Sequence, residues 1–103
     1  MNDFDAEEAL ISCLITEPES IENVYGMVSP EMFESSILGK MYFEYRKAFD
    51  EHKNLTIVEL NQIMSPDYKD YEIADAISRC VSASALPFQI RYRTFYNHQF
   101  SLL

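Results

Sequence analysis

The strongest pattern in the sequence is SSILGKMYFEYRKAFDEH, which spans residues 35–52. Its apolar side chains recur every three or four residues, the spacing at which side chains share one face of an α-helix. This face consists of Leu38, Met41, Tyr42, Tyr45, Phe49 and His52. The other sides carry the charged residues Glu44, Arg46, Lys47, Asp50 and Glu51. The stretch predicts an amphipathic helix of about four turns, with His52 as a cation near its C-terminal end.

Three shorter helical patterns precede this helix. The first begins at Asp5, a predicted N-cap that Glu8 complements three residues later, and it stops before Pro18. A second short helix follows Pro18 and is terminated by Gly26. Pro30 opens a single further turn. The apolar face of the first helix consists of Ala6, Ala9, Leu10, Cys13 and Leu14.

Three more helical patterns follow it. Thr56 and Glu59 form a capping box that opens a helix ending at Ser65-Pro66, with Leu60, Ile63 and Met64 predicted to face inward. The next helix is marked by Ile73, Ala74, Ile77 and Val81. A last helix starts at Pro87 and carries Phe88, Tyr92, Phe95, Tyr96, Gln99 and Leu103. The fold class predicted is all-α: a compact bundle of about six short helices that forms one domain over residues 1–103.

Charge is distributed very unevenly along the chain. The sequence holds 17 acidic and 8 basic side chains. Residues 1–39 contain nine of the acids and no Lys or Arg, so the formal net charge of −9 belongs to this part. Such a surface repels phosphates and favours a protein or cationic partner over nucleic acid. The candidate acidic surface consists of Glu7, Glu17, Glu19 and Glu22.

Several classes of protein do not fit the sequence. No run of 18 apolar residues occurs, and the acidic start lacks the basic region of a secretory signal, so a cytoplasmic location is predicted. Cys13 and Cys80 lie far apart on apolar helix faces without metal-ligand spacing, and we expect both to be buried and reduced.

Catalytic motifs are missing from the sequence as well. Gly26 and Gly39 are the only glycines, too few for a glycine-rich phosphate loop. Neither His52 nor His98 has a second ligand or an acid at helical spacing, and no Gly-x-Ser-x-Gly elbow occurs. The chain is therefore predicted not to be an enzyme and to hold no cofactor or metal.

One cluster combines aromatic and basic side chains in the predicted last helix: Phe88, Arg91, Tyr92, Arg93, Phe95 and Tyr96. Aromatic residues with Arg occur in protein interface hot spots and in base-stacking platforms, whereas their helical spacing also fits a core. Core packing, a protein interface and nucleic-acid contact are three open readings, with nucleic acid the least favoured.

Four stretches resemble, in order and spacing, the N-terminal domain of DnaB-type replicative DNA helicases. They are AEEALISCLI at 6–15, EPESI at 17–21, SPEMF at 29–33 and LTIVEL at 55–60. The chain departs from the family pattern at Leu38, where a His is frequent, and at Gly39, where an Arg is usual.

The resemblance implies a helical domain in the collar of a hexameric helicase ring. Such a domain pairs with other subunits and contributes to contacts with the primase and the helicase loader, so a homodimer is possible. ATP and Mg²⁺ are expected only in a separate motor domain, and the family's C-terminal helical hairpin is expected to be truncated at Leu103. The alternatives are a free-standing acidic regulator or inhibitor of a replication protein, and a weak nucleic-acid binder that uses the last helix.

Overall fold

The computed structural model describes residues 3–82, and the predicted last helix with its aromatic and arginine side chains lies outside them. The described elements are α1 (Asp3–Thr16), η1 (Pro18–Ser20), α2 (Ile21–Val24), η2 (Pro30–Met32), α3 (Ser36–Asp50), α4 (Ile57–Met64) and α5 (Asp70–Ser82). The described residues contain no strand, which confirms the all-α prediction. Asp5 is not an N-cap as predicted, because α1 already begins at Asp3.

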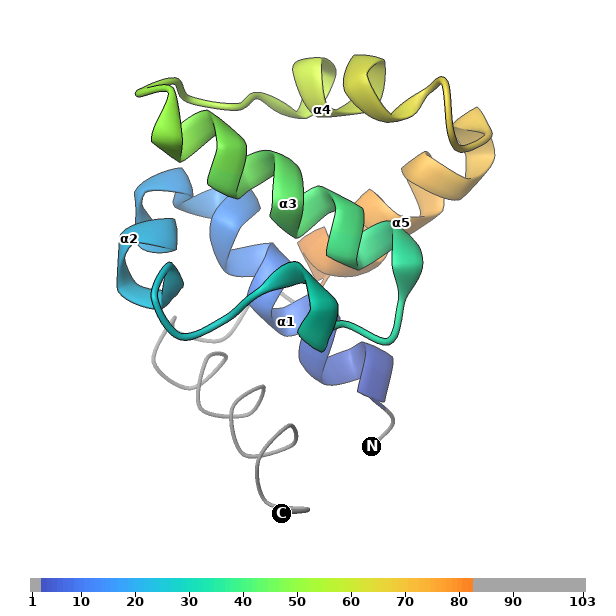
Figure 1. Cartoon of the computed structure of the whole chain (residues 1–103). Helices are drawn as coiled ribbons and strands as arrows, with labels where there is room; N and C mark the ends of the chain where they lie inside the picture. The colour runs from blue at the N-terminus through green and yellow to red at the C-terminus, as the bar shows by residue number, and fades with distance from the viewer. Residues whose placement is uncertain (1–2, 83–103) are drawn as a thin grey trace.

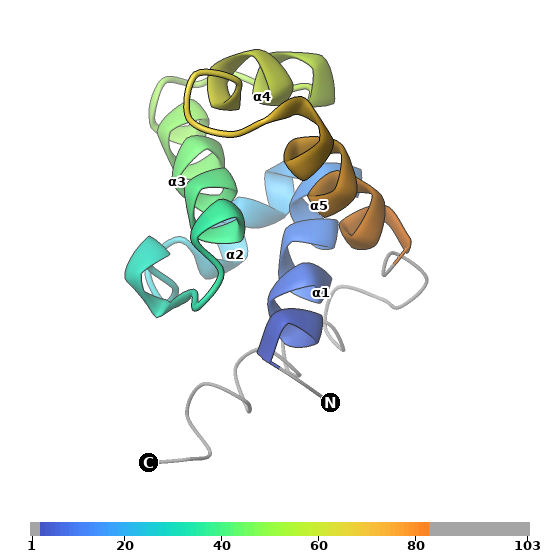
Figure 2. The same ribbon diagram turned by 90° about the vertical axis from the view of Figure 1, so that its right-hand side faces the viewer.

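The most deeply buried helix is α1. Between Ala6 and Leu14, every side chain except that of Glu8 is buried. Both α3 and α5 pack against α1, while α4 spans from α3 to α5 at the top of the bundle (Figures 1 and 2). A helix buried on nearly all sides needs apolar residues all around it, which explains why Ile11 extends the predicted face.

Helix α3 is fixed at its start by Ser35, whose Oγ accepts a hydrogen bond from the backbone N–H of Leu38 at 3.3 Å. Leu38, Met41, Tyr42 and Tyr45 are buried, as the sequence predicts. Glu44 is buried too, contrary to the prediction, with 6% of its side chain exposed. Its carboxylate pairs with Lys40 Nζ at 2.9 Å, and this bond raises the pKa of Lys40.

The C-terminal end of α3 has a different conformation from the one predicted. The helix stops at Asp50, and His52 takes a left-handed conformation with φ 57°. The N–H of Lys53 donates to the carbonyl oxygen of Ala48 at 2.8 Å, and that of His52 donates to Phe49 at 3.1 Å. This is a Schellman motif, so His52 is exposed at the cap rather than on the apolar face. Phe49 is also partly exposed, at 38%.

Close approach of η2 to α3 accounts for the glycine that departs from the family pattern. A Cβ at Gly39 would lie 3.2 Å from the carbonyl oxygen of Pro30 and 3.2 Å from Phe33 Cβ. The absence of a side chain therefore lets the η2 turn rest directly on α3. A larger residue at this position requires the turn to shift.

The capping box predicted for α4 is confirmed. Thr56 Oγ1 accepts from Glu59 N at 3.1 Å, and Thr56 N donates to Glu59 Oε1 at 3.2 Å. Leu60 and Met64 are buried as predicted, whereas Ile63 is 39% exposed.

Helix α5 forms where the sequence predicts a helix, but not all of the residues that mark it are buried. Its buried side chains are Ile73, Ala76 and Cys80, while Ala74 and Val81 are exposed. Of the four residues that mark this helix in the sequence, Ile73 alone is fully buried, and Ile77 is half-buried. A second apolar row of α5, Ala74, Ile77 and Val81, therefore lies on its outer side, and Ala74 and Ile77 lie beside α4.

Candidate docking surfaces

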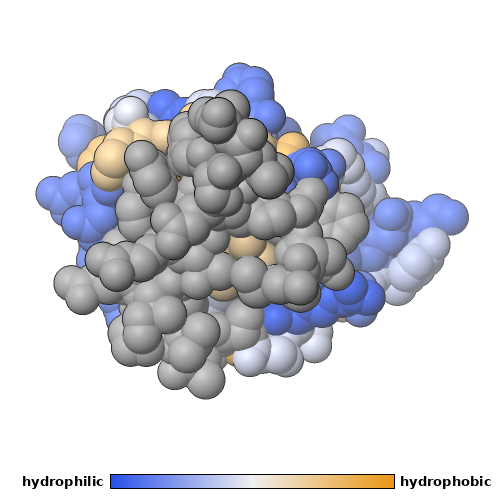
Figure 3. Space-filling view, turned by 90° about the horizontal axis from the view of Figure 1, so that it is seen from below, coloured by the Kyte–Doolittle hydropathy of each residue, from blue (hydrophilic) through white to orange (hydrophobic). Residues whose placement is uncertain are grey.

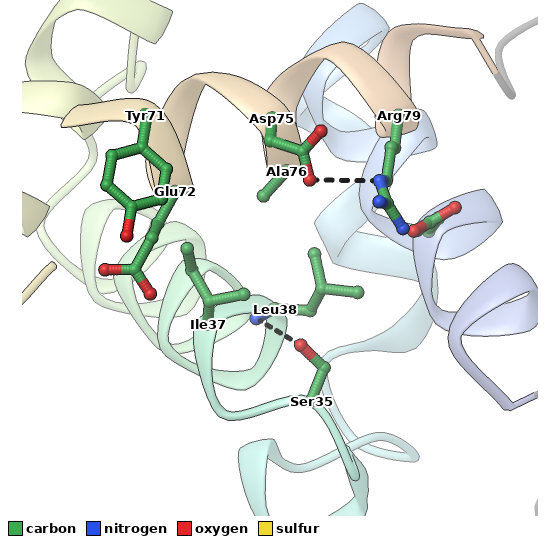
Figure 4. Close-up of a pocket in the computed structure, with 9 residues that line it drawn as sticks. Ser35, Ile37, Leu38, Tyr71, Glu72, Asp75, Ala76 and Arg79 are labelled. Atoms are coloured by element: carbon green, nitrogen blue, oxygen red, sulfur yellow. Dashed lines mark hydrogen bonds and ion pairs between the residues drawn. The ribbon is translucent and has the colours of Figure 1, made fainter. Parts of the chain in front are cut away.

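A groove of about 550 Å³ opens between the start of α3 and the length of α5, with α1 at one edge. Its apolar lining comes from Ile37 and Leu38 of α3 and from Ala76 of α5 (Figure 4). The remaining lining residues are polar or aromatic: Glu8, Ser35, Tyr71, Glu72, Asp75 and Arg79. We call this feature the α3–α5 groove.

Helix α5 supplies most of the polar lining of the α3–α5 groove, because Glu72, Asp75 and Arg79 recur at helical spacing along one side. Arg79 forms an ion pair with Asp75 (Figure 4). The distance from Arg79 Nε to Asp75 Oδ2 is 3.0 Å, and both side chains are more than 60% exposed. An ion pair that is so exposed contributes at most about 1 kcal/mol. Glu72 Oε1 accepts from the backbone N–H of Lys69 at 3.0 Å, which fixes the start of α5.

A second surface lies where α4 and α5 meet. Ile57, Val58 and Asn61 of α4 line a hollow of about 530 Å³ together with Asp70, Ala74, Ile77 and Ser78 of α5. Val58 is 66% exposed and Ile57 42% exposed. We call this feature the α4–α5 apolar surface. The helical patterns in the sequence did not predict this surface, because Ile57 and Val58 lie in the capped first turn of α4, beside the residues predicted to face inward.

The candidate acidic surface is smaller than predicted. Glu17, Glu19 and Glu22 are exposed along the turn from α1 through η1 to α2. In the view from below, the described side chains around the edge of the domain are mostly hydrophilic (Figure 3). Glu7 does not belong to this surface, because its side chain is fully buried. Its Oε2 accepts from the backbone N–H of Glu34 at 2.7 Å, and its Oε1 accepts from that of Ser35 at 3.1 Å.

The other predicted interface residues, Phe88, Arg91, Tyr92, Arg93, Phe95 and Tyr96, lie outside the described part of the chain. Within residues 3–82, no group of three or more His, Cys, Asp or Glu side chains could hold a metal ion. In the same range, no helix is both long enough and apolar enough to cross a membrane.

Both cysteines are buried and neither forms a disulfide bond, as predicted. Burial, reinforced by the charge of Glu8, raises the pKa of the Cys80 thiol to about 12. Burial and the nearby Cys80 also raise the pKa of Tyr45 to about 12. The unfolded chain releases these protons at lower pH than the native state, so these groups favour the native state fully below about pH 9 and lose that contribution as the pH rises toward 12.

The free energy of unfolding is therefore expected to fall above about pH 9, by about 1.4 kcal/mol per pH unit for each group that titrates only in the unfolded state. Urea unfolding followed by circular dichroism at stepped alkaline pH measures this decline. Tyr45→Phe removes one of the two groups, so its stability should fall less steeply above about pH 10. Equal slopes for the variant and the parent would contradict the assignment.

Comparison with known proteins identifies the family. The sequence model described as the DnaB-like helicase N-terminal domain matches residues 1–92. Neither the curated proteins nor the solved structures contain a match to the chain. The matched range covers α1 to α5 and all four stretches that carry the sequence resemblance. This chain belongs to the family of DnaB-like helicase N-terminal domains.

Proposed function

We propose that the chain is a non-catalytic assembly and docking domain of a replicative DNA helicase. In this role it contacts other helicase subunits in the ring collar and receives the primase and the helicase loader. ATP and Mg²⁺ act in a separate motor domain, and the complex works in the cytoplasm. Weak nucleic-acid binding through the predicted last helix, with Arg91 and Arg93, is a separate and less favoured alternative.

The observation that carries this proposal is the exposure of the α4–α5 apolar surface. Val58 and Ile57 are exposed and line the same hollow as Ala74 and the half-buried Ile77, whereas the core cluster buries its apolar side chains. Exposed apolar side chains that gather in one place are a feature of protein interaction sites. A partner that covers it removes apolar side chains from water, the main driving force of protein association.

Sedimentation of the pure chain, alone and with the primase and loader of its own organism, tests the proposal. We expect reversible association that Val58→Asp weakens roughly tenfold or more, because a carboxylate would be desolvated in the interface. Met27→Asp is the matched control: Met27 is 52% exposed and does not line the α4–α5 apolar surface. Absence of association with all three proteins would overturn the assembly and docking role.

A free-standing acidic regulator is the second candidate, favoured by the exposed carboxylates of Glu17, Glu19 and Glu22. The same sedimentation experiment separates the two candidates. If the triple Glu→Gln variant loses partner binding and Val58→Asp keeps it, the acidic regulator is supported.

A further inference from the structure

We propose that the α3–α5 groove binds an arginine-bearing segment of a partner protein. This inference rests on the proposed docking function but uses a different surface from the α4–α5 apolar surface. Its volume of about 550 Å³ lies in the range of about 300–1,000 Å³ that is typical of ligand pockets, so it suits a few side chains of a short segment.

The charge of the groove selects a cationic occupant. Among the described residues that line it are three acidic side chains, Glu8, Glu72 and Asp75, and one basic side chain, Arg79, so the formal charge of this described lining is −2. Arg79 is already paired with Asp75, in an exposed and therefore weak ion pair that an incoming cation can rearrange. An anionic segment or a nucleic-acid phosphate would be repelled by the same carboxylates.

The geometry distinguishes a side-chain cation from a metal ion. The groove carboxylates form no cluster that could hold a metal, as is true of all the described residues. A guanidinium group spreads its charge over a plane with five N–H donors, and so can contact separated carboxylates.

The apolar and aromatic lining favours arginine further. Leu38 and Ala76 provide an apolar floor, with 3% and 7% exposed, on which the aliphatic stem of a long basic side chain can lie. Tyr71 is 68% exposed at the rim, and Lys69 Nζ lies 5.8 Å from its ring centroid. The ring therefore already attracts one cation, and an arginine guanidinium stacks on such a ring better than an ammonium group.

Two synthetic peptides serve as probes, one with two arginines flanking a leucine and a matched one with glutamates in their place. Amide shifts in nuclear magnetic resonance spectra of the full chain report where each peptide binds. We expect the arginine peptide to shift residues of α5 and the first turn of α3, with an affinity that falls as salt rises. The glutamate peptide should leave these resonances unchanged.

Three variants sharpen the experiment. Glu72→Gln combined with Asp75→Asn should weaken arginine-peptide binding about tenfold, whereas Arg79→Gln should strengthen it by removing the competing cation. Glu17→Gln, at the candidate acidic surface, should have no effect. Weaker binding by Arg79→Gln, or shifts that cluster around Glu17 and Glu22, would overturn the proposal.

The probe also separates this inference from the proposed function. Val58→Asp should leave peptide binding intact, since Val58 does not line the α3–α5 groove. Sedimentation that succeeds while the arginine peptide fails to bind therefore rejects the groove and retains the assembly role. If the arginine peptide binds but the chain associates with neither itself, the primase nor the loader, the assembly role is rejected and the groove is retained.

Discussion

Replacing Glu7 by alanine is expected to lower the free energy of unfolding by about 3 kcal/mol, one of the two largest losses we expect from a single substitution. The carboxylate is fully buried and accepts hydrogen bonds from the backbone N–H groups of Glu34 and Ser35. Both donors lose this partner in the alanine variant, and a cavity is left beside α1. Because Ser35 is the N-cap of α3, the bond also ties α1 to the start of that helix.

The position of the Glu7 carboxylate at the start of α3 stabilises its negative charge. The N-terminal end of α3, a 15-residue helix, carries the positive end of the helix dipole, which favours a nearby anion. Glu7→Gln keeps the shape but not the charge, so we expect it to lose roughly half as much stability as Glu7→Ala.

Thermal and urea unfolding followed by circular dichroism measure both Glu7 variants. A loss of about 3 kcal/mol corresponds to a fall in Tm of about 12–24 °C for a domain of this size. Glu17→Gln, at an exposed position, is the control and should change stability by less than about 0.5 kcal/mol. If Glu7→Ala were as mild as this control, the carboxylate would not hold α3 to α1.

Local signals in the sequence predicted the helices well because they depend on neighbouring residues. Thr56 and Glu59 cap α4 through atoms three residues apart, and no other part of the fold is needed for that contact. Pro30 likewise opens η2, as its fixed backbone angle predicts. The same kind of signal was wrong at α1, which begins at Asp3 rather than after Asp5.

Which face of a helix points inward depends on the rest of the fold. Along α5, Ile73, Ala76 and Cys80 form one apolar row, and Ala74, Ile77 and Val81 form another beside it. Periodicity allows either row to face the core, and packing against α1 selects the first. The α4–α5 apolar surface and the α3–α5 groove both follow from that choice, so neither could be predicted from the sequence.

The prediction that Glu7 lies on an exposed surface was wrong for a related reason. An acid in the first turns of a helix is usually exposed, and its position beside Glu8 suggested a solvated face. One signal was present, however: Glu7 is four residues before Ile11 and seven before Leu14, so the three share a face. That face is buried because α1 is surrounded on nearly all sides.

Truncating Tyr42 to alanine is expected to cost about 3–5 kcal/mol, the range for removal of a large aromatic side chain from a core. Tyr42 is fully buried in α3, and its ring centroid lies 5.3 Å from that of Phe33. Its hydroxyl donates to the carbonyl oxygen of Val28 at 2.6 Å, which fixes the segment between α2 and η2. Tyr42→Ala removes the ring and its hydroxyl hydrogen bond, and it leaves a cavity in the core.

Tyr42→Phe isolates the hydroxyl. Among the described residues, the carbonyl oxygen of Val28 then keeps the long contact from Arg46 Nη1, at 3.5 Å, so we expect this variant to lose about 1–2 kcal/mol. Phe43→Ala, at the neighbouring position in α3, is the control. Phe43 is 46% exposed, so its truncation should lower the free energy of unfolding by less than about 1 kcal/mol. Urea unfolding measures all three variants. A Phe43→Ala loss equal to that of Tyr42→Ala would mean that α3 is rotated in its packing. A Tyr42→Phe variant as stable as the parent would mean that the hydroxyl bond to Val28 does not stabilise the loop.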